Sequence, residues 1–202
     1  MKVHLASRNT KKLGELDRIL GPLIPGIEVV GLDSVAFYEE PVEDGATFAE
    51  NALIKARAGF AATGLPTVAD DSGLCVDALN GMPGVLSARW AGPPKSDHRN
   101  NDLVLAQLSD VPDERRGAAF ACVIAYVDAE REIVVAGEMR GRIRHEVSGQ
   151  GGFGYDPMFE PDETPGRTSA ELTPAEKDAV SHRGHALRAL AEALSRVYPQ
   201  RI

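Results

Sequence analysis

The chain has 202 residues, of which 43% are hydrophobic and 26% are charged, and its formal net charge is −8 at pH 7. These values are typical of one or at most two folded domains and exclude a wholly disordered chain. The acidic balance argues against non-specific binding to nucleic acid or to an anionic membrane, because such partners are bound through basic patches.

The apolar runs are well short of the roughly 20 residues that a membrane span needs. No signal-peptide pattern follows Met1, so we expect a cytoplasmic protein. Cys75 and Cys122 lie far apart in apolar segments. We expect two small buried hydrophobic side chains there, and nothing in their setting requires a disulfide.

The first 45 residues alternate strand and helix signals. Residues 2–6 are predicted to form a strand, and the polar run 7–11 leads into an amphipathic helix that Pro22 should end. Residues 27–32 predict a second strand, and a turn-rich acidic stretch follows over 39–45.

A helix and a strand are predicted next. Thr47 and Glu50 have the spacing of a capping box, so a helix should start there and stop at Gly64. Residues 67–69 predict a strand, with Asp70 and Asp71 at its end.

The middle of the chain combines an irregular stretch with a hairpin. Residues 80–94 are rich in Gly and Pro, and Ser96 or Asp97 could cap the helix that follows. Two apolar runs, 118–127 and 132–139, have the length and spacing of an antiparallel hairpin.

The C-terminal region predicts two helices. Thr173 and Glu176 form another capping box, with Pro174 at the first helical position. The last helix should begin near His185 and end at Pro199. Since strands and helices mix throughout and no long polar linker is present, we expect residues 1–202 to form a single domain of the α/β or the α+β class, with a mixed sheet.

The adjacent acids Asp70 and Asp71 are the strongest local signal for chemistry. Two carboxylates at a strand end are costly for folding and useful for holding Mg²⁺, and Glu43 and Glu50 lie just upstream. An Asx turn with both acids in solvent is the alternative, and the residues 70–73 by themselves favour neither.

Cationic residues could serve an anionic ligand. Asn9 and Lys12 lie where a loop enters a helix, a setting that suits phosphate, although a solvated turn is the commoner outcome. Lys55 on its amphipathic helix is, by itself, more often a surface charge.

Two further segments each allow a functional and a structural interpretation. The glycines of 149–154 suit a backbone that closely approaches another group, such as a ligand or a neighbouring segment. Phe153 and Tyr155 could offer flat faces to a base, or their rings could simply join the core. The segment 181–184 lies between two predicted helices and could reach a ligand or cap a helix. Nothing in the chain resembles a Ser-His-Asp hydrolase or a zinc site.

Five blocks, taken in order, closely resemble the inosine triphosphate pyrophosphatase family. They are Ser7–Lys12, Thr47–Ala52 with Lys55 and Ala56, Ala69–Leu74, Gly152–Pro157 and Ser181–Gly184. The resemblance covers almost the whole chain. It implies a long twisted mixed sheet flanked by helices, with a central cleft between two lobes, in a homodimeric enzyme. It also implies Mg²⁺-dependent hydrolysis of ITP, dITP and XTP to the monophosphate and pyrophosphate.

The resemblance also implies roles for individual residues. Asp71 would be the proton acceptor and a metal ligand, and Glu43 and Asp70 are the further candidate ligands. The residues implied to bind substrate are Ser7, Arg8, Asn9, Thr10, Lys11, Lys12, Lys55, Ser72, Phe153, Gly154, Tyr155, Asp156, Lys177, His182 and Arg183. The chain departs from the family pattern at Arg8, where many relatives have Gly, and at Val42, where many have an acid.

A mechanism follows as a hypothesis. Asp71 would activate a water for attack at the α-phosphorus, while Lys12 and Lys55 offset the polyphosphate charge. Donors from Lys177, His182 or Arg183 would suit the 6-oxygen of hypoxanthine or xanthine and disfavour adenine. The alternatives are a pyrophosphatase for another modified nucleotide, such as a pyrimidine, and a nucleotide-binding protein without catalysis.

Overall fold

The computed structural model describes residues 1–198, apart from the side chain of Thr10. The described part of the chain forms a sheet of six strands in the order β2-β1-β3-β4-β5-β6. They are β1 (Lys2–Leu5), β2 (Glu28–Val30), β3 (Thr67–Val76), β4 (Gly117–Val127), β5 (Glu132–Ile143) and β6 (Phe159–Pro161). β1 pairs in parallel with β2 and β3, whereas β5 and β6 are antiparallel. The predicted mixed sheet is therefore confirmed.

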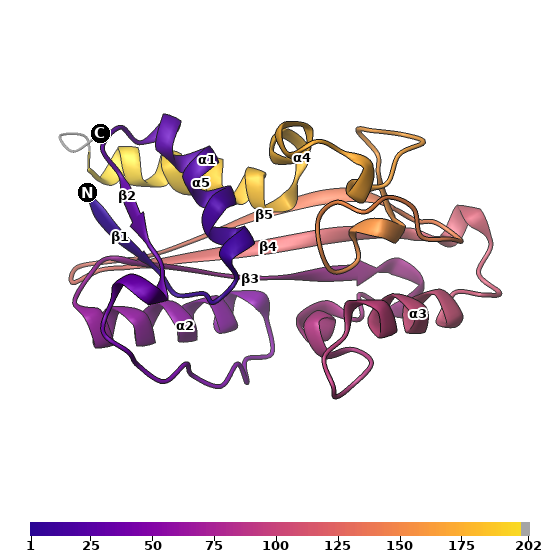
Figure 1. Ribbon diagram of the computed structural model, residues 1–202, viewed down its shortest axis with the longest axis horizontal. Coiled ribbons are helices and arrows are strands. Elements are labelled where there is room, and N and C mark those ends of the chain that lie inside the picture. The colour runs from indigo at the N-terminus through magenta and orange to yellow at the C-terminus, as the bar shows by residue number, and fades with distance from the viewer. Residues whose placement is uncertain (199–202) are drawn as a thin grey trace. The chain divides into compact units, whose positions relative to one another are not determined.

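Within residues 1–198, five α-helices accompany the strands (Figure 1). They are α1 (Thr10–Leu23), α2 (Phe48–Thr63), α3 (Asp97–Gln107), α4 (Pro174–Val180) and α5 (His182–Val197). Short 3₁₀ helices fill several of the connections, including Gly84–Arg89 and Ser169–Glu171. Over residues 1–198, none of the helices combines the length and the apolar character that crossing a bilayer would require.

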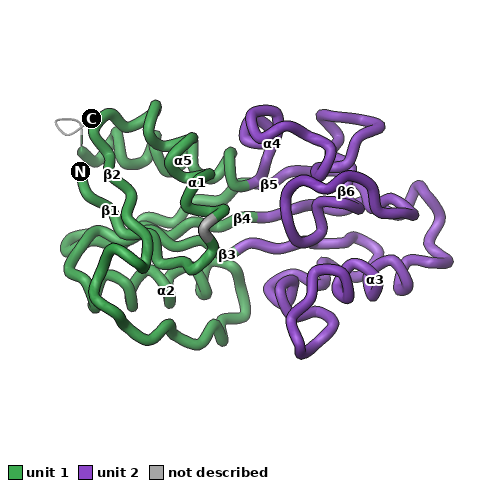
Figure 2. The backbone as a smooth tube through the Cα atoms, in the orientation of Figure 1, with its two compact units in different colours: residues 1–71, 122–137, 183–202 green, residues 72–121, 138–182 purple. Residues whose placement is uncertain are grey.

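The chain divides into two compact units (Figure 2). Unit 1 comprises residues 1–71, 122–137 and 183–202, and unit 2 comprises residues 72–121 and 138–182. The strands β3, β4 and β5 each contribute residues to both units. The boundary within β3 falls directly after Asp71.

Unit 1 has a core on each face of its part of the sheet. In Figure 1, α1 and α5 lie on one side of the strands and α2 lies on the other. Val68 belongs to the cluster formed with α1 and α5, and the next residue, Ala69, belongs to the cluster formed with α2. Successive side chains of a strand point to opposite faces, so β3 supplies both cores in turn.

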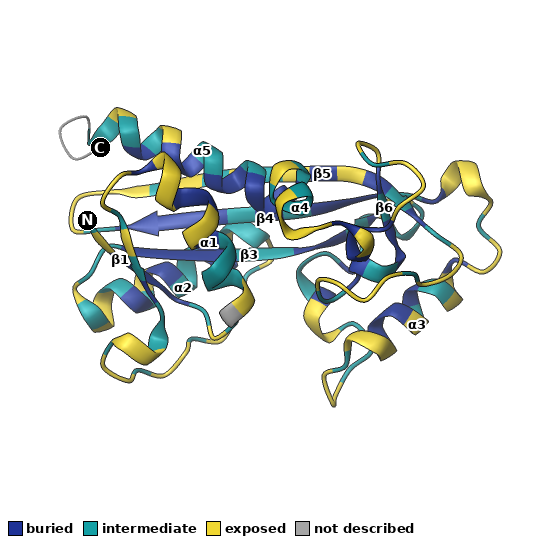
Figure 3. Ribbon diagram, turned by 45° about the horizontal axis from the view of Figure 1, so that its top comes forward, coloured by how far each residue is buried: buried dark blue, intermediate teal, exposed yellow. Residues whose placement is uncertain are grey.

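Unit 2 has a single main core. Leu74 and Val76 of β3 pack there with Val104 and Leu108 from the α3 region and with Phe159 of β6. All five residues are buried, and Figure 3 colours buried positions of the ribbon dark blue. The core fixes α3 beside the loops that precede β6.

The predicted helix caps are confirmed. Thr47 and Glu50 form a capping box at the start of α2, and the helix ends at Gly64, which adopts the left-handed conformation with φ 67°. Thr173 and Glu176 form the second box, at the start of α4. Each box satisfies backbone N–H groups that a helix start leaves without partners.

Several element boundaries differ from prediction, among them those of α1, β3, β5 and α5. α1 continues through Pro22 to Leu23, because a proline in the last turn removes only one helical hydrogen bond. β3 continues beyond Ala69 to Val76, so the acidic pair lies within the strand. α5 begins at His182, three residues earlier than predicted. The predicted end at Pro199 lies outside the described residues.

The two cysteines are both free thiols. Cys122 is buried, as predicted, whereas Cys75 is only half-buried. Burial raises the pKa of the Cys122 thiol to about 12. This group therefore remains a neutral core side chain at physiological pH.

Candidate active site

The strand β3 separates the two adjacent acids. Asp70 has the same orientation along the strand as Val68 and faces α1 and α5, whereas Asp71 has the orientation of Ala69 and faces α2. Their partners confirm this, because Asp70 binds Lys12 of α1 and Asp71 binds Asn51 of α2. The two carboxylates therefore belong to different environments.

Asp71 lies in a polar cluster with α2 and the loop before it. Asn51 donates from Nδ2 to Asp71 Oδ2 at 3.0 Å, and Lys55 Nζ lies 3.9 Å from Asp71 Oδ1. The same ammonium donates to Glu43 Oε2 at 2.9 Å. Lys55 thus bridges two carboxylates, which would otherwise repel each other.

Asn51 joins this cluster to the loop that carries Glu43. It is 1% exposed, and its Oδ1 accepts from the Gly45 N–H at 2.9 Å while its Nδ2 serves Asp71. A Cβ at Gly45 would lie 2.8 Å from Asn51 Oδ1, so only glycine allows this approach. Both ends of the Asn51 amide are therefore committed, which fixes its orientation.

Burial changes the acid chemistry of Asp71. It raises the pKa of Asp71 above the ordinary value, while Lys55 and the hydrogen bond from Asn51 act in the opposite direction. A carboxylate with a raised pKa is a better proton acceptor than an exposed one. The setting of Asp71 is thus compatible with general base chemistry.

The donor set suits a magnesium ion that also contacts a ligand. Mg²⁺ is commonly held by one or two carboxylates together with substrate phosphates and water, and Asp71 and Glu43 supply two carboxylates around one ammonium. Over residues 1–198, no group of three or more His, Cys, Asp or Glu side chains gathers as a complete metal cage would. A metal here would depend on phosphate oxygens for the rest of its coordination.

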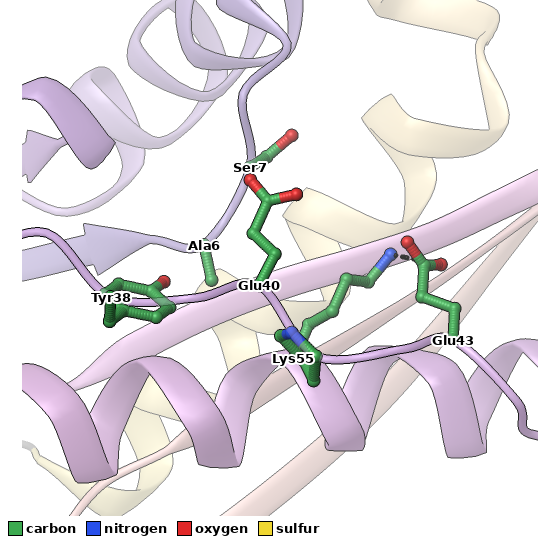
Figure 4. Close-up of a pocket in the computed structure, with 7 residues that line it drawn as sticks. Ala6, Ser7, Tyr38, Glu40, Glu43 and Lys55 are labelled. Carbon is green, nitrogen blue, oxygen red and sulfur yellow. Dashed lines mark hydrogen bonds and ion pairs between the residues drawn. The ribbon is translucent and has the colours of Figure 1, made fainter.

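A small pocket opens next to this cluster (Figure 4). Ser7, Tyr38, Glu40, Glu43 and Lys55 are among the residues that line its volume of about 70 Å³. Figure 4 shows Lys55 reaching from α2 to Glu43. Because whole-ligand sites usually measure about 300–1,000 Å³, this pocket could hold only a part of a nucleotide.

Asp70 is enclosed by cations on the other face of the sheet. Lys12 Nζ donates to Asp70 Oδ1 at 2.9 Å, and Arg183 Nη2 donates to Asp70 Oδ2 at 3.1 Å. Burial would raise the pKa of Asp70, but Lys12 and Arg183 lower it well below the ordinary value. Arg183 also donates to Glu15 at 2.7 Å, which completes a buried network of alternating charges.

This network bears on two predicted roles, which stay predictions. Asp70 is 2% exposed and already serves two cations, so its placement argues against a role as metal ligand. Arg183 is equally buried and serves Asp70 and Glu15, which argues against its donating to a base. Both predictions rested on neighbours in the chain, whereas strand alternation and pairing set the surroundings of the two residues.

The N-terminal loop is partly committed to structure. Asn9 caps α1, and its side chain accepts from the Lys11 N–H at 3.0 Å. The Ser7 hydroxyl accepts from the Asn9 N–H at 3.2 Å. Arg8 points to Glu40, with 2.6 Å between Nε and Oε1, and Lys11 is exposed. The predicted loop into a helix is confirmed, and the side chain of Thr10 lies outside the described residues.

A second group of predicted residues lies together in unit 2. Asp156 is 2% exposed, and its Oδ2 accepts from the Phe153 N–H at 2.8 Å and from Lys177 Nζ at 2.6 Å. Lys177 also lies 5.2 Å from the centroid of the Phe153 ring, a cation–π distance. The Phe153 ring and the Lys177 ammonium therefore form one feature with a flat face and a positive charge.

The remaining predicted residues lie at buried or half-buried positions. Tyr155 is 4% exposed and donates from its hydroxyl to the Ser87 carbonyl at 2.7 Å. His182 stacks on Phe120, with 4.9 Å between ring centroids. Ser72 is half-buried in β3. Through these contacts, Tyr155 and His182 pack into the interior of unit 2.

Asn51 belongs to the site but was not among the predicted site residues. On the predicted helix, Asn51 and Lys55 form a polar stripe beside the apolar face. An amide side chain four residues before a lysine, next to the apolar face of the predicted helix, was the available signal. Without the strand partner, nothing in the sequence linked that stripe to Asp71.

Comparisons with known proteins identify the family. A sequence profile described as the Ham1 family matches residues 3–193. A dITP/XTP pyrophosphatase of Mycolicibacterium paratuberculosis is 62% identical over 191 residues, which are 94% of this chain and 94% of that protein. One from Nocardia farcinica is 61% identical over 96% of this chain and 95% of that protein.

Solved structures of related proteins support the same family assignment. A nucleoside-triphosphatase, or dITP/XTP pyrophosphatase, of Mycobacterium abscessus is 60% identical with a TM-score of 0.77, covering 94% of this chain and 98% of that one. A HAM1 protein from Coxiella burnetii is 41% identical with a TM-score of 0.85, and the match covers 97% of this chain and 99% of that one. The resemblance seen in the five sequence blocks is thereby confirmed, and the chain belongs to the Ham1 family.

Proposed function

We propose that this protein hydrolyses non-canonical purine nucleoside triphosphates, namely dITP, ITP and XTP, to the monophosphate and pyrophosphate. The observation that carries the proposal is the Asp71 cluster, in which a half-buried carboxylate is aimed by Asn51 and faces Lys55 and Glu43. Relatives that share 61–62% of their residues with this chain are named for the same activity.

We propose that Asp71 is the proton acceptor for an attacking water. Its raised pKa supports this role, as does its firm orientation by Asn51. Lys55 supplies positive charge beside the acid, which an acidic protein needs in order to accept a polyphosphate. In-line attack at the α-phosphorus then releases pyrophosphate without a covalent intermediate on the protein.

We propose Mg²⁺ as the cofactor, with Asp71 and Glu43 as its protein ligands. When bound, the ion would neutralise phosphate charge and polarise a phosphoryl oxygen. Lys55 would release Glu43 for this purpose, because a single ammonium holds both carboxylates in the structure. Asp70 is not included, since Lys12 and Arg183 occupy its oxygens.

We propose separate groups of residues for the phosphates and for the base. In unit 1, Ser7, Arg8 and Lys55 are the groups beside the pocket or at its rim. In unit 2, the Phe153 ring offers a flat face, and Lys177 is a donor suited to the 6-oxygen of hypoxanthine or xanthine. Adenine presents an amino donor at that position, so it would leave the Lys177 ammonium opposite another donor.

We also propose a cytoplasmic homodimer. The support for both statements is the family resemblance, together with the acidic, globular composition. Sedimentation equilibrium at several protein concentrations would measure the assembly, and a monomer at all concentrations would contradict the dimer.

A pyrophosphate-release assay tests the activity. The panel is ITP, dITP, XTP, GTP, ATP and a modified pyrimidine triphosphate, each with and without Mg²⁺. We expect Mg²⁺-dependent release that is fastest with dITP, ITP and XTP. Preference for the pyrimidine would indicate a different substrate class, and binding without release would indicate a non-catalytic nucleotide-binding protein.

A further inference from the structure

We propose that Asp97 and Asn101 of α3 are positioning residues that hold Gly154 and thereby set which purine base the protein accepts. This inference rests on the proposed function for its substrate class. It assigns a role to a helix that lies outside the predicted site blocks. The observations that support it all lie within unit 2.

Gly154 differs from the other glycines of its loop. A Cβ at Gly149 or Gly151 would lie 2.7 Å from the backbone of Ala170, and one at Gly152 would collide with the Asp156 carboxylate. These three glycines are explained by close packing within unit 2. At Gly154, by contrast, the Cβ position meets no atom within 4 Å. This glycine therefore borders open space next to Phe153.

The peptide groups of Gly154 are held from α3. The Gly154 N–H donates to Asp97 Oδ2 at 2.8 Å, and the Gly154 carbonyl accepts from Asn101 Nδ2 at 3.1 Å. Asp97 and Asn101 are four residues apart, so both project from the same side of the helix. Gly154 has a φ of 63°, which glycine tolerates without strain. The two side chains thus hold both polar groups of one residue in a single orientation.

Asp97 and Asn101 together form what we call the Gly154 clamp. The helix α3, which carries this clamp, is itself fixed. Ser96 caps α3, and Val104 lies in the unit 2 core. Asn100 accepts from the Ala91 N–H at 2.8 Å and donates to the Ser87 carbonyl at 3.3 Å. The clamp is therefore mounted on a rigid element, which is how a site retains its geometry.

The residues on either side of Gly154 depend on the same framework. Tyr155 donates to the Ser87 carbonyl, which also accepts from Asn100. The Phe153 N–H is held by Asp156, and Lys177 lies over the Phe153 ring. A shift of Gly154 would therefore move the Phe153 ring relative to Lys177, and with it the face and the donor proposed for the base.

This geometry explains how α3 could influence specificity without touching the base. Discrimination between bases rests on donors placed within about 0.5 Å of the productive position. A loosened loop would still bind a purine ring by stacking, but it would no longer penalise a mismatched exocyclic group as strongly. Loss of the clamp should therefore affect binding and selectivity more than the chemical step.

The test compares Asp97→Ala, Asp97→Asn and Asp102→Ala. Asp97→Ala removes the acceptor for the Gly154 N–H, whereas Asp97→Asn keeps an oxygen that can accept it. Asp102→Ala is the matched control, because Asp102 lies on the same helix and pairs with His98 on the surface. Asp97 is exposed, so its replacement should leave unit 2 folded.

Two readouts are measured on the full chain. Hydrogen exchange of a peptide spanning residues 150–158, in the absence of nucleotide, reports the clamp directly. Pyrophosphate release from ITP and GTP reports KM, kcat and the ratio of kcat/KM between the two substrates. We expect Asp97→Ala to speed exchange about tenfold, to raise KM for ITP about tenfold and to reduce the ITP-to-GTP ratio about tenfold. The value of kcat should change by less than about threefold.

The controls decide between positioning and general destabilisation. Asp97→Asn should restore most of the exchange protection and most of the selectivity, and Asp102→Ala should match the unmodified protein in both readouts. Unchanged exchange in Asp97→Ala would overturn the clamp, and faster exchange with an unchanged ITP-to-GTP ratio would overturn its role in specificity. If the unmodified protein released no pyrophosphate from any purine triphosphate, the proposed function and the specificity role would both fail. Hydrogen exchange would then still show whether Asp97 holds Gly154.

Discussion

Asp70 and Asp71 are neighbours in the chain with opposite surroundings. Asp70 faces α1 and α5, where Lys12 and Arg183 neutralise it in a buried network. Asp71 faces α2, where an amide and a shared ammonium leave it beside a small open pocket. One strand thus provides a structural acid and a candidate catalytic acid at consecutive positions, and side-chain alternation is the physical cause.

The largest expected effect concerns the acid that faces α2. We predict that Asp71→Asn lowers pyrophosphate release by about 10²–10⁴-fold, because the amide cannot accept the proton and is a poorer metal ligand. The melting temperature should stay within a few degrees of the unmodified value, since Asn keeps the shape of the side chain. Near-full activity at saturating Mg²⁺ would show that Asp71 has another role.

The acid on the other face should behave in the opposite way. We predict that Asp70→Asn lowers the free energy of unfolding by about 3–5 kcal/mol, because it removes the counter-ion of the half-buried Lys12 and leaves the buried Arg183 with Glu15 as its remaining carboxylate partner. Urea denaturation measures this quantity.

A double variant tests whether Asp70 and Arg183 stabilise the fold through their mutual ion pair. Asp70→Asn combined with Arg183→Met should cost less than the sum of the two single changes, since both remove the same pair. Strict additivity, or an Asp70→Asn variant as stable as the unmodified protein, would contradict the structural role of Asp70.

The shared ammonium provides the next test. We predict that Lys55→Met raises KM for a purine triphosphate about tenfold, equivalent to about 1.4 kcal/mol, because the pocket loses its positive charge. Arg57→Met is the control on the same helix, since Arg57 forms an exposed pair with Glu132. Equal effects of the two substitutions would indicate only a general loss of charge.

The smallest expected effect concerns the amide that aims Asp71. We predict that Asn51→Asp lowers kcat about fivefold, because the new carboxylate still accepts from the Gly45 N–H but no longer donates to Asp71. Asn100→Asp makes the same chemical change in a buried helical Asn of unit 2, where the lost donor served a neutral carbonyl. Mg²⁺ dependence should change in the first variant and stay constant in the second.

Local signals predicted most of the elements. The capping boxes at Thr47 and Thr173 placed two helix starts correctly, because a cap depends on residues three positions apart. The turn between the two apolar runs likewise correctly placed β4 next to β5. These features need no information about distant parts of the chain.

The roles of the site residues were harder to predict because they depend on partners far away in sequence. The strand containing Asp70 and Asp71 was expected to end before them, and the acids were therefore taken as one group. In β3 they alternate, and their partners come from α1, α2 and α5. Asn101 and Gly154 are likewise 53 positions apart. Such pairings follow from packing and have no signature in a short motif.

The most direct test locates the metal. A crystal of the protein is soaked with Mn²⁺ and a non-hydrolysable dITP analogue, and anomalous diffraction is measured to find the ion. We predict an ion in direct contact with the Asp71 carboxylate, on the α2 face of β3, and an Asp70 still paired with Lys12 and Arg183. An ion bound to Asp70, or one held away from Asp71, would contradict the division of roles between the two acids.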